Sequence, residues 1–369
     1  MKKRFLSTVS MKKFLSMVMV VSILLGIFSV SANADSSAQF LTTTADNITE
    51  YTDSSNRVIR TYTKGTNTMA TMNDVESTML GLGMTEREIQ RLTLEEKEVF
   101  ANSSSIFSIS SYIKTEEDGI SYLVSEDVAM KESAEQQKQV RETYEELLSR
   151  AASNDPYEDY DSYEDFDVSD MYPTNTYINI WVGVAHMGGR TYLFTINTRW
   201  LSMPYERKTD AVGVISQEIS VNPDSWYGYY EFKTEYSGTS GSIPSYEEFF
   251  DSDVSNVNNG TFSGCGVDFE LPKDALQSGI TGSYVIQSDF YVHFSFTADI
   301  RDYLFPKVFS VIGSYVHTTT NMSGEATLGI SVGADMEQIG LSVDATIGFA
   351  NDVKQESRSV LLQLDYPGM

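Results

Sequence analysis

A strict alternation of apolar residues with small or polar ones in residues 326–349 limits the folds open to this chain more than any other feature. Apolar side chains occupy every second position of two runs, residues 326–334 and 339–349, and Gly, Ser, Thr or Asp fill the positions between them. A repeat of two places one class of side chain on each face of a β-strand. The two runs, joined by residues 335–338, therefore predict a β-hairpin with one apolar face.

The amino terminus has the three parts of a secretory signal peptide. Basic residues lie in the first 13 positions, residues 14–30 are almost entirely apolar, and Ala32-Asn33-Ala34 is a small-x-small cleavage site. We expect residues 1–34 to be the signal, with translation starting at Met1 or Met11 and cleavage after Ala34. The mature protein is then secreted and extracellular. A secreted chain whose single cysteine excludes an internal disulfide is typical of bacteria.

The charge of the mature chain narrows the classes of partner. The signal contains five basic and no acidic residues, so 21 basic residues remain against 52 acidic ones, a formal charge of −31. Such an acidic chain repels nucleic acid and anionic lipid. The composition therefore favours an extracellular protein or glycan as partner, and a membrane only under the pore hypothesis described below.

The chain as a whole is predicted to be of the α+β class. Residues 35–153 form a small, mostly helical amino-terminal region, with helices near residues 86–102 and 127–152. Residues 154–172 form an acidic, tyrosine-rich linker. Residues 173–369 form a predominantly antiparallel β domain, a β-sandwich or an elongated one, because turn signals separate regular short strands and no helix suits a βαβ crossover.

Two capping boxes give the amino-terminal region its clearest signals. Thr85 and Glu88, and again Thr93 and Glu96, place a hydroxyl three residues before a glutamate. In this arrangement both side chains bind free backbone N–H groups at the start of a helix. The pattern predicts one helix over residues 86–92 and another over 94–102.

The acidic linker is the one candidate for a cation site. Eight of the 17 residues from 154 to 170 are acidic, but the segment lacks the glycine and the ligand spacing of a calcium loop. We interpret it as a solvated linker, with weak calcium binding as the alternative. The three histidines, His186, His293 and His317, do not have zinc-site spacing, so no other metal and no cofactor is expected.

Aromatic residues and one arginine around two strands are the candidate binding residues. Side chains of this kind stack on sugars or on a protein partner, although core packing also explains about half of those aromatics. The candidates are Trp226, Tyr227, Tyr229, Tyr230, Trp200 and Arg207. Residues 237–263 are expected to be a long loop, which either frames a binding surface or is disordered.

The hairpin suggests a second kind of function. Its runs of nine and eleven residues are long enough to cross a bilayer, and in pattern they resemble the membrane-inserting hairpin of β-pore-forming toxins. The lipid-facing residues would be Leu328, Ile330, Val332, Leu341, Val343 and Ile347. The alternative is an ordinary pair of sandwich strands with one buried face. Membrane-spanning strands usually carry aromatic residues at both ends, and only Phe349 of this hairpin is such a residue.

No motif for catalysis is evident. The sequence lacks a Gly-x-Ser-x-Gly elbow, a phosphate-binding loop and a zinc-protease helix, and Cys265 has no protease signature around it. No catalytic residue is predicted. This argues against an enzymatic function but does not exclude one. The leading interpretation is a non-catalytic secreted binding protein, followed by a pore-forming protein and then by a hydrolase acting on cell-wall material.

Overall fold

The structure is a computed structural model, in which the chain divides into two units, Met1–Gln39 and Phe40–Met369. All described residues belong to the second unit. They are residues 40–42, 47–53, 55–64, 72–117, 119–153, 175–204, 207–217, 219–236, 242–251, 253–258, 262–273, 275–277, 283–301, 308–318, 328–331, 346–349 and 355–365. The expected signal peptide and acidic linker lie outside them, and both stay predictions.

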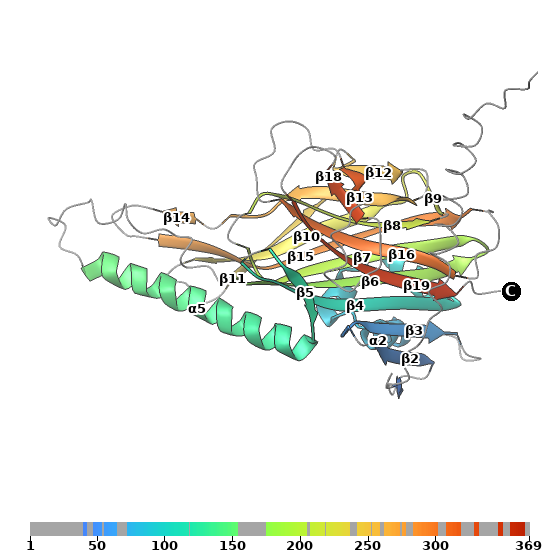
Figure 1. The fold of residues 1–369 in the computed structure, drawn as a ribbon, viewed down its shortest axis with the longest axis horizontal. Coiled ribbons are helices and arrows are strands. Elements are labelled where there is room, and N and C mark those ends of the chain that lie inside the picture. Colours follow the sequence, from blue (N-terminus) through green and yellow to red (C-terminus); the bar gives the residue numbers. More distant parts are fainter. Residues whose placement is uncertain are drawn as a thin grey trace, which may run out of the picture. The chain divides into compact units, whose positions relative to one another are not determined.

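Antiparallel strands dominate the described residues, and helices are fewer (Figure 1). The helices are α2 (Met72–Gly81), α3 (Glu86–Arg91), α4 (Leu94–Asn102) and α5 (Glu126–Ser153). The strands are β1 (Phe40–Thr42), β2 (Ile48–Thr52), β3 (Val58–Thr63), β4 (Ser105–Thr115), β5 (Ser121–Val124), β6 (Thr176–Gly188), β7 (Thr191–Ser202), β8 (Thr209–Gln217), β9 (Ile219–Val221), β10 (Tyr227–Tyr236), β11 (Ser242–Glu248), β12 (Val254–Asn258), β13 (Phe262–Glu270), β14 (Ala275–Gln277), β15 (Ser283–Ile300), β16 (Val308–Thr318), β17 (Leu328–Ser331), β18 (Thr346–Phe349) and β19 (Gln355–Asp365).

The described strands form three sheets. The large sheet has the order β1-β2-β3-β4-β6-β7-β15-β10-β11, with β5, β9 and β14 paired at its margins. The small sheet has the order β12-β13-β8-β16-β19, and β17 and β18 form a third, two-stranded sheet. Because β4 pairs with β6 over ten residue pairs, the segments before and after the acidic linker contribute to one sheet.

The two main sheets pack face to face and share one hydrophobic core. On β6 and β7 the even-numbered residues, such as Val182 and Phe194, face this core, where they meet Val214 of β8 and Val311 of β16. Removing this apolar surface from water supplies the main stabilising free energy of the arrangement. The packing is that of a β-sandwich, in agreement with the predominantly antiparallel β fold that the strand pattern predicts.

Helices cover the opposite face of the large sheet. The odd-numbered Trp181 of β6 belongs to a second hydrophobic cluster with residues of α2, α3 and α4, and its indole N–H donates to the carbonyl of Leu82 at 2.9 Å. Further along β6, Tyr177 packs with Ala129 of α5. The large sheet is therefore buried on both faces, by the small sheet on one side and by helices on the other.

Both predicted capping boxes are present. Thr85 and Glu88 cap α3, and Thr93 and Glu96 cap α4, with each threonine hydroxyl and each glutamate carboxylate accepting from the backbone as expected. The long helix α5 also agrees with the prediction of a helix over residues 127–152. None of the helices in the described residues combines the length and apolarity needed to cross a membrane.

Two segments differ from the sequence-based expectation. Residues 237–263, expected to be one long loop, contain β11 and β12, and only the short connections between strands lie outside the described residues. The amino-terminal region, expected to be mostly helical, begins its described part with the strands β1, β2 and β3, which precede the helix α2. In both cases pairing or packing with distant residues stabilises elements whose Gly-, Ser-, Thr- and Asn-rich sequences have weak local preferences.

The ends of the predicted hairpin pair as expected. Ile330 of β17 lies opposite Ile347 of β18, in antiparallel register. Between these strands, residues 332–345 lie outside the described residues, and so does the expected connection at residues 335–338. β18 lies against β8, β16 and β19 of the small sheet. On the face of the small sheet away from the shared core, Ile215 and Ile312 are fully buried.

A glycine on β16 provides a test of how closely the two main sheets approach. A Cβ added to Gly313 would lie 2.2 Å from Val182 Cγ2 of the facing sheet. Because such overpacking costs about 1–3 kcal/mol, we expect Gly313→Ala to lower the free energy of unfolding by that amount in urea denaturation. Gly189→Asn is the control, since no atom lies within 4 Å of a Cβ there and asparagine tolerates the φ of +60°. Equal stability of Gly313→Ala and wild type would contradict the packing.

Candidate functional site

The candidate site lies on the helix-covered face of the large sheet, where β7, β15 and β10 run side by side. Across these strands His293 pairs with Asn197 on one side and with Tyr229 on the other. One step along, Tyr291 pairs with Arg199 and Glu231. The even-numbered neighbours of these residues fill the apolar core. The alternation that builds the core therefore also gathers polar and aromatic side chains on the other face, beneath α3 and α4.

A buried ion pair joins α4 to this face. His293 Nε2 lies 2.8 Å from Glu96 Oε1, and His293 Nδ1 lies 2.8 Å from Asn197 Oδ1. Ser295 Oγ donates to the same Glu96 oxygen at 2.7 Å, and the backbone N–H of Thr93 donates to Glu96 Oε2 at 2.9 Å. Burial alone would raise the pKa of Glu96, but the charge and hydrogen bond of His293 outweigh it and lower this pKa to about 2.

Aromatic rings connect this ion pair to the surface. The Tyr229 ring stacks on His293 with centroids 5.2 Å apart, and Tyr246 of β11 lies on the other side of Tyr229 at 5.0 Å. Arg91 of α3 lies over the Tyr246 ring, 5.2 Å from its centroid. Tyr229 and His293 are fully buried, whereas Tyr246 is 38% exposed. The column of rings thus ends at the β11 edge of the sheet.

Beside the column lies a charged cluster, here called the Asp289 cluster, which consists of Asp289, Glu231, Arg87, Arg91, Arg199 and Lys233. The Asp289 carboxylate forms ion pairs with Lys233 Nζ at 2.6 Å, Arg87 Nη1 at 2.5 Å and Arg199 Nη2 at 2.9 Å. Glu231 binds Arg87 Nε at 2.5 Å and Arg91 Nη2 at 3.3 Å. Burial alone would raise the pKa of Asp289, but these cations lower it.

A small cavity borders Asp289 beneath α5. Its volume is about 50 Å³. Its wall includes Gln136 and Arg141 of α5, Glu235 of β10 and the predicted binding residue Arg207. Arg141 contacts Glu235 at 3.1 Å, while Gln136 Oε1 is buried and has no hydrogen-bond partner within the described part of the chain.

The geometry of Glu96 and His293 is that of a structural brace rather than of a catalytic group. In a Ser-His-Asp triad the histidine lies between the hydroxyl and the carboxylate and accepts the proton of the hydroxyl. Here the Ser295 hydroxyl and the His293 ring both donate to Glu96, and all three side chains are buried. The arrangement therefore holds α4 on the sheet, and the groups that face outward belong to Tyr246 and the Asp289 cluster.

The structure separates the predicted binding residues into two groups. Trp200 is buried in the shared core, where its indole N–H donates to the Tyr315 hydroxyl at 2.6 Å. Tyr230 faces the same core and stacks on Phe269 at 5.9 Å. Tyr229 is fully buried on the helix-covered face. Trp200 and Tyr229 are therefore not available to an outside ligand, because both faces of the large sheet are covered.

Three predicted residues stay closer to the surface or to the cavity. Tyr227 is half-buried and shares a hydrogen bond of 3.0 Å with Tyr246. Trp226 is half-buried against the core. Arg207 is buried, and its guanidinium donates to the carbonyls of Pro204 and Pro272 at 3.1 and 3.0 Å. Of the sequence-based candidates, Tyr227 and Arg207 thus take part in the site.

Some of the predicted lipid-facing residues lie outside the described residues. Leu328 and Ile330 are in β17 and Ile347 is in β18, whereas Val332, Leu341 and Val343 fall outside the described residues. Within those residues, no group of three His, Cys, Asp or Glu side chains comes close enough to hold a metal ion. The acidic linker, the candidate for calcium, is not among them.

The sequence did not reveal the partners of His293 and His317. His317 Nδ1 lies 2.8 Å from Asp210 Oδ1 between the two main sheets, as His293 lies against Glu96. Cys265 is a core residue of β13, and burial raises its pKa to about 12, as suits an inert thiol. The capping boxes signalled Glu96 only as a helix cap. Nothing local indicated that the same carboxylate binds His293, about 200 residues away in the chain.

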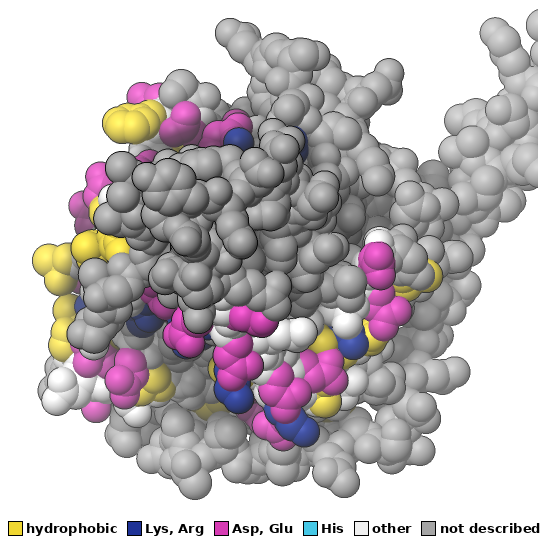
Figure 2. Space-filling model, turned by 90° about the vertical axis from the view of Figure 1, so that its left-hand side faces the viewer, with side chains coloured by type: hydrophobic (Ala, Val, Ile, Leu, Met, Phe, Trp, Pro, Cys, Tyr) yellow, Lys and Arg dark blue, Asp and Glu magenta, His cyan; other side chains and the backbone are white. Residues whose placement is uncertain are grey.

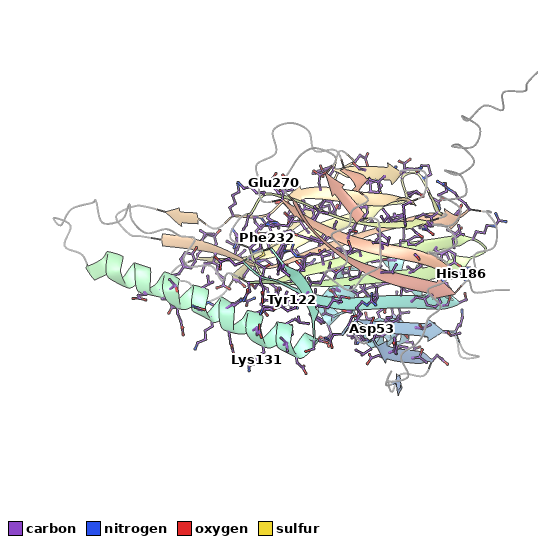
Figure 3. The ribbon with its side chains drawn as sticks, viewed as in Figure 1. Asp53, Tyr122, Lys131, His186, Phe232 and Glu270 are labelled. Carbon is purple, nitrogen blue, oxygen red and sulfur yellow. The ribbon has the colours of Figure 1, made fainter. Side chains whose placement is uncertain are left out.

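Figure 3 shows where the site lies along the sheets. Phe232, which neighbours the charged positions of β10, lies toward one end together with Glu270, whereas His186 lies toward the other. His186 is separate from the site. It contacts Ser104 Oγ at 2.7 Å and stacks on Tyr192 at 4.8 Å.

Comparison with known proteins identifies no family. No protein-family model matches the chain, and no curated protein matches it. Among solved structures, similarity is found to AvmM, described as catalysing macrocyclization in alchivemycin A biosynthesis (10% identity, 49% of this chain and 83% of that chain, TM-score 0.22). The pilus backbone RrgB from Streptococcus pneumoniae (8%, 49% and 69%, 0.22) and Clostridium perfringens delta-toxin (8%, 89% and 96%, 0.20) are also similar. TM-scores this low establish neither a shared fold nor a shared function.

The brace predicts a specific dependence of stability on pH. Because the folded-state pKa of Glu96 is about 2 against its usual 4.5, its ionised form stabilises the protein fully above pH 4.5, and this is lost as the pH falls toward 2. The contribution is about 3 kcal/mol. We expect the Glu96→Gln variant to lack this stabilising contribution. Between pH 6 and pH 2.5 the free energy of unfolding should therefore fall more for wild type than for the variant. Glu95→Gln, at an exposed position of the same helix, is the control and should follow wild type.

Proposed function

We propose that the mature protein is a secreted, non-catalytic binding protein that contacts a cell-surface or extracellular partner through its β11 edge. The observation that carries this proposal is the group of exposed side chains on and beside β11. Ile243 is 58% exposed, Tyr246 38% and Phe250 71%. These groups lie on and beside one edge strand, with Ile243 and Tyr246 on opposite faces of the sheet, and exposed apolar side chains at such an edge are available to a partner.

The edge also carries features that oppose pairing with copies of itself. Within the described part of the chain, β11 pairs only with β10. Pro244 lacks a backbone N–H, and Glu247 and Glu248 add charge to the same strand. Proline and charge on an edge strand disfavour indiscriminate strand addition. The side chains of the strand, rather than its backbone, are therefore the groups that support recognition.

The predicted signal peptide supports an extracellular location for this function. The basic, apolar and small-x-small segments in residues 1–34 direct the chain to the exterior, and the mature charge of −31 keeps it soluble there. The buried Glu96–His293 pair favours binding over catalysis, since it has the geometry of a brace.

A retention assay tests the proposal. The mature chain, beginning at Asp35, is applied to isolated bacterial cell walls and to an array of immobilised glycans and extracellular proteins. We expect Ile243→Ser with Phe250→Ser to weaken retention at least about tenfold, because the exposed apolar contact is lost. The matched control is Ile120→Ser with Met187→Ser, whose exposed fractions are 45% and 42%. Equal retention of both double variants, or no retention of wild type, would refute the edge as a binding surface.

A second candidate, formation of a membrane pore by residues 326–349, is favoured by the way β17 and β18 are held. They pair with each other and with no other described strand, although β18 lies against β8, β16 and β19. Their release would break no ladder hydrogen bond of the small sheet in the described residues. A hairpin whose described ends pair only with each other suits a segment that leaves the protein to enter a bilayer.

Dye release from liposomes tests this second candidate. Val343→Asp with Ile330→Asp places charges on the apolar face, so a variant that folds like wild type should release no dye if the hairpin enters the membrane. Release by wild type alone would support the pore. No release by wild type at micromolar concentration across several lipid mixtures would reject it.

A further inference from the structure

A serine and a histidine from distant parts of the chain meet toward one end of the large sheet. Ser104 follows the end of α4 and His186 lies near the end of β6, and Ser104 Oγ is 2.7 Å from His186 Nδ1 although the two residues are 82 positions apart. Figure 3 shows His186 toward the end opposite Phe232, which pairs with Ser245 of β11. Figure 2 views the molecule from the side nearer Phe232, where Asp and Glu side chains lie beside hydrophobic ones. The Ser104–His186 pair is therefore separate from the proposed binding surface at β11.

The second ring nitrogen of His186 determines which partner carries the proton. His186 Nε2 lies 3.2 Å from the carbonyl oxygen of Gly189, and a carbonyl oxygen can only accept a hydrogen bond. In the neutral ring the proton is therefore on Nε2, and Nδ1 has a free electron pair. The Ser104 hydroxyl then donates to Nδ1. This is the arrangement of a nucleophile and its general base, with the Gly189 carbonyl as the group that orients the base.

The other two histidines do not have this arrangement. His293 contacts the Glu96 carboxylate, and His317 contacts the Asp210 carboxylate. Both of these rings are buried. Among the described contacts, His186 alone binds a serine hydroxyl and no carboxylate. The direction of its hydrogen bond is the one that proton transfer from a serine nucleophile requires.

The pair is held on one side and open on the other. Tyr192 of β7 is buried and stacks on the His186 ring, with centroids 4.8 Å apart. The carbonyl of Ser104 accepts from the backbone N–H of Lys64 at 2.9 Å. Ser104 is exposed, and a Cβ added to Gly189 would have no atom within 4 Å. A reagent from solvent can therefore reach a hydroxyl and a base whose positions are already set.

We propose that Ser104 is a nucleophile that accepts an acyl group from an activated carboxylic ester, with His186 as its base. Ser104 Oγ bonds to the carbonyl carbon while its proton passes to His186 Nδ1. The bond from that carbon to the leaving oxygen then breaks, and the leaving oxygen takes the proton from Nδ1. The products are an acyl-serine and a free alcohol or phenol. The ester is of the activated kind because a neutral carbonyl stabilises the imidazolium less than the carboxylate of a catalytic triad does.

This inference goes beyond the proposed binding function and does not depend on it. Uptake of an acyl group at Ser104 would modify the protein covalently, at a place away from the β11 edge. Retention at β11 and acylation at Ser104 are measured in different assays, so that either can fail while the other stands.

Reaction with p-nitrophenyl acetate tests the inference. The complete mature chain, beginning at Asp35, is mixed with the ester, the release of p-nitrophenolate is followed with time, and samples are quenched with acid. Peptide mass spectrometry then locates the acetyl group. The test variants are Ser104→Ala and His186→Gln. The matched control is Ser77→Ala, which removes an exposed serine hydroxyl from α2.

The expected result links the serine to its base. Wild type and Ser77→Ala acquire an acetyl group on Ser104 at the same rate, and Ser104→Ala acquires none at that position. His186→Gln, with an unchanged melting temperature, is acetylated on Ser104 at least about a hundredfold more slowly, because a general base contributes at least this much. Ser104→Cys, which keeps a nucleophile at the same place, is acetylated again.

Two results would overturn the inference. Acetylation of wild type on lysine side chains or the amino terminus, with none on Ser104, would show that this hydroxyl is not a nucleophile. Equal rates of acetylation on Ser104 in wild type and in folded His186→Gln would show that the histidine does not activate it, and that the hydrogen bond only joins β6 to the end of α4.

Discussion

Burial of the large sheet on both faces is the constraint on which the rest of this structure depends. Along β7, β15 and β10 the even-numbered side chains meet the small sheet and are apolar. The odd-numbered ones face the helices, and at the centre they include His293, Glu231 and Arg199. Polar groups removed from water must be paired, because an unpaired one costs several kcal/mol. The helices α3 and α4 therefore do more than cover the face, since they supply Glu96 and Arg87 as partners.

The same requirement explains why the candidate binding surface lies where it does. Toward the β11 edge the helical cover ends, and the column of rings from His293 through Tyr229 reaches the exposed Tyr246. The Asp289 cluster lies alongside, with its cations partly in solvent. A rigid, fully buried brace next to exposed aromatic and charged groups holds those groups in position, as recognition without large rearrangement requires.

Parts of the fold were predictable because their signals are local. The Thr85 and Thr93 capping boxes fix where α3 and α4 begin, since hydroxyl and carboxylate act within one helical turn. Alternation predicted most strands, including the antiparallel pairing at Ile330. β11 was missed because its Ser, Pro and Glu residues give no alternation, and it forms by pairing with β10. The candidate site was only partly predictable. Tyr227 and Arg207 belong to it, but aromatic content could not distinguish the exposed Tyr246 from the buried Trp200.

The sequence by itself determined the predominantly antiparallel β class of the fold, the starts of α3 and α4, and the acidic character of the chain, because these follow from periodicity, capping chemistry and composition. Only the tertiary structure decided that residues before and after the acidic linker share one sheet through β4 and β6. It also decided that Glu96 meets His293, and that Asp289 gathers cations from α3, β7 and β10. These contacts join residues from about 55 to about 200 positions apart, where no local preference acts and only the packing of the whole sheet specifies the neighbours.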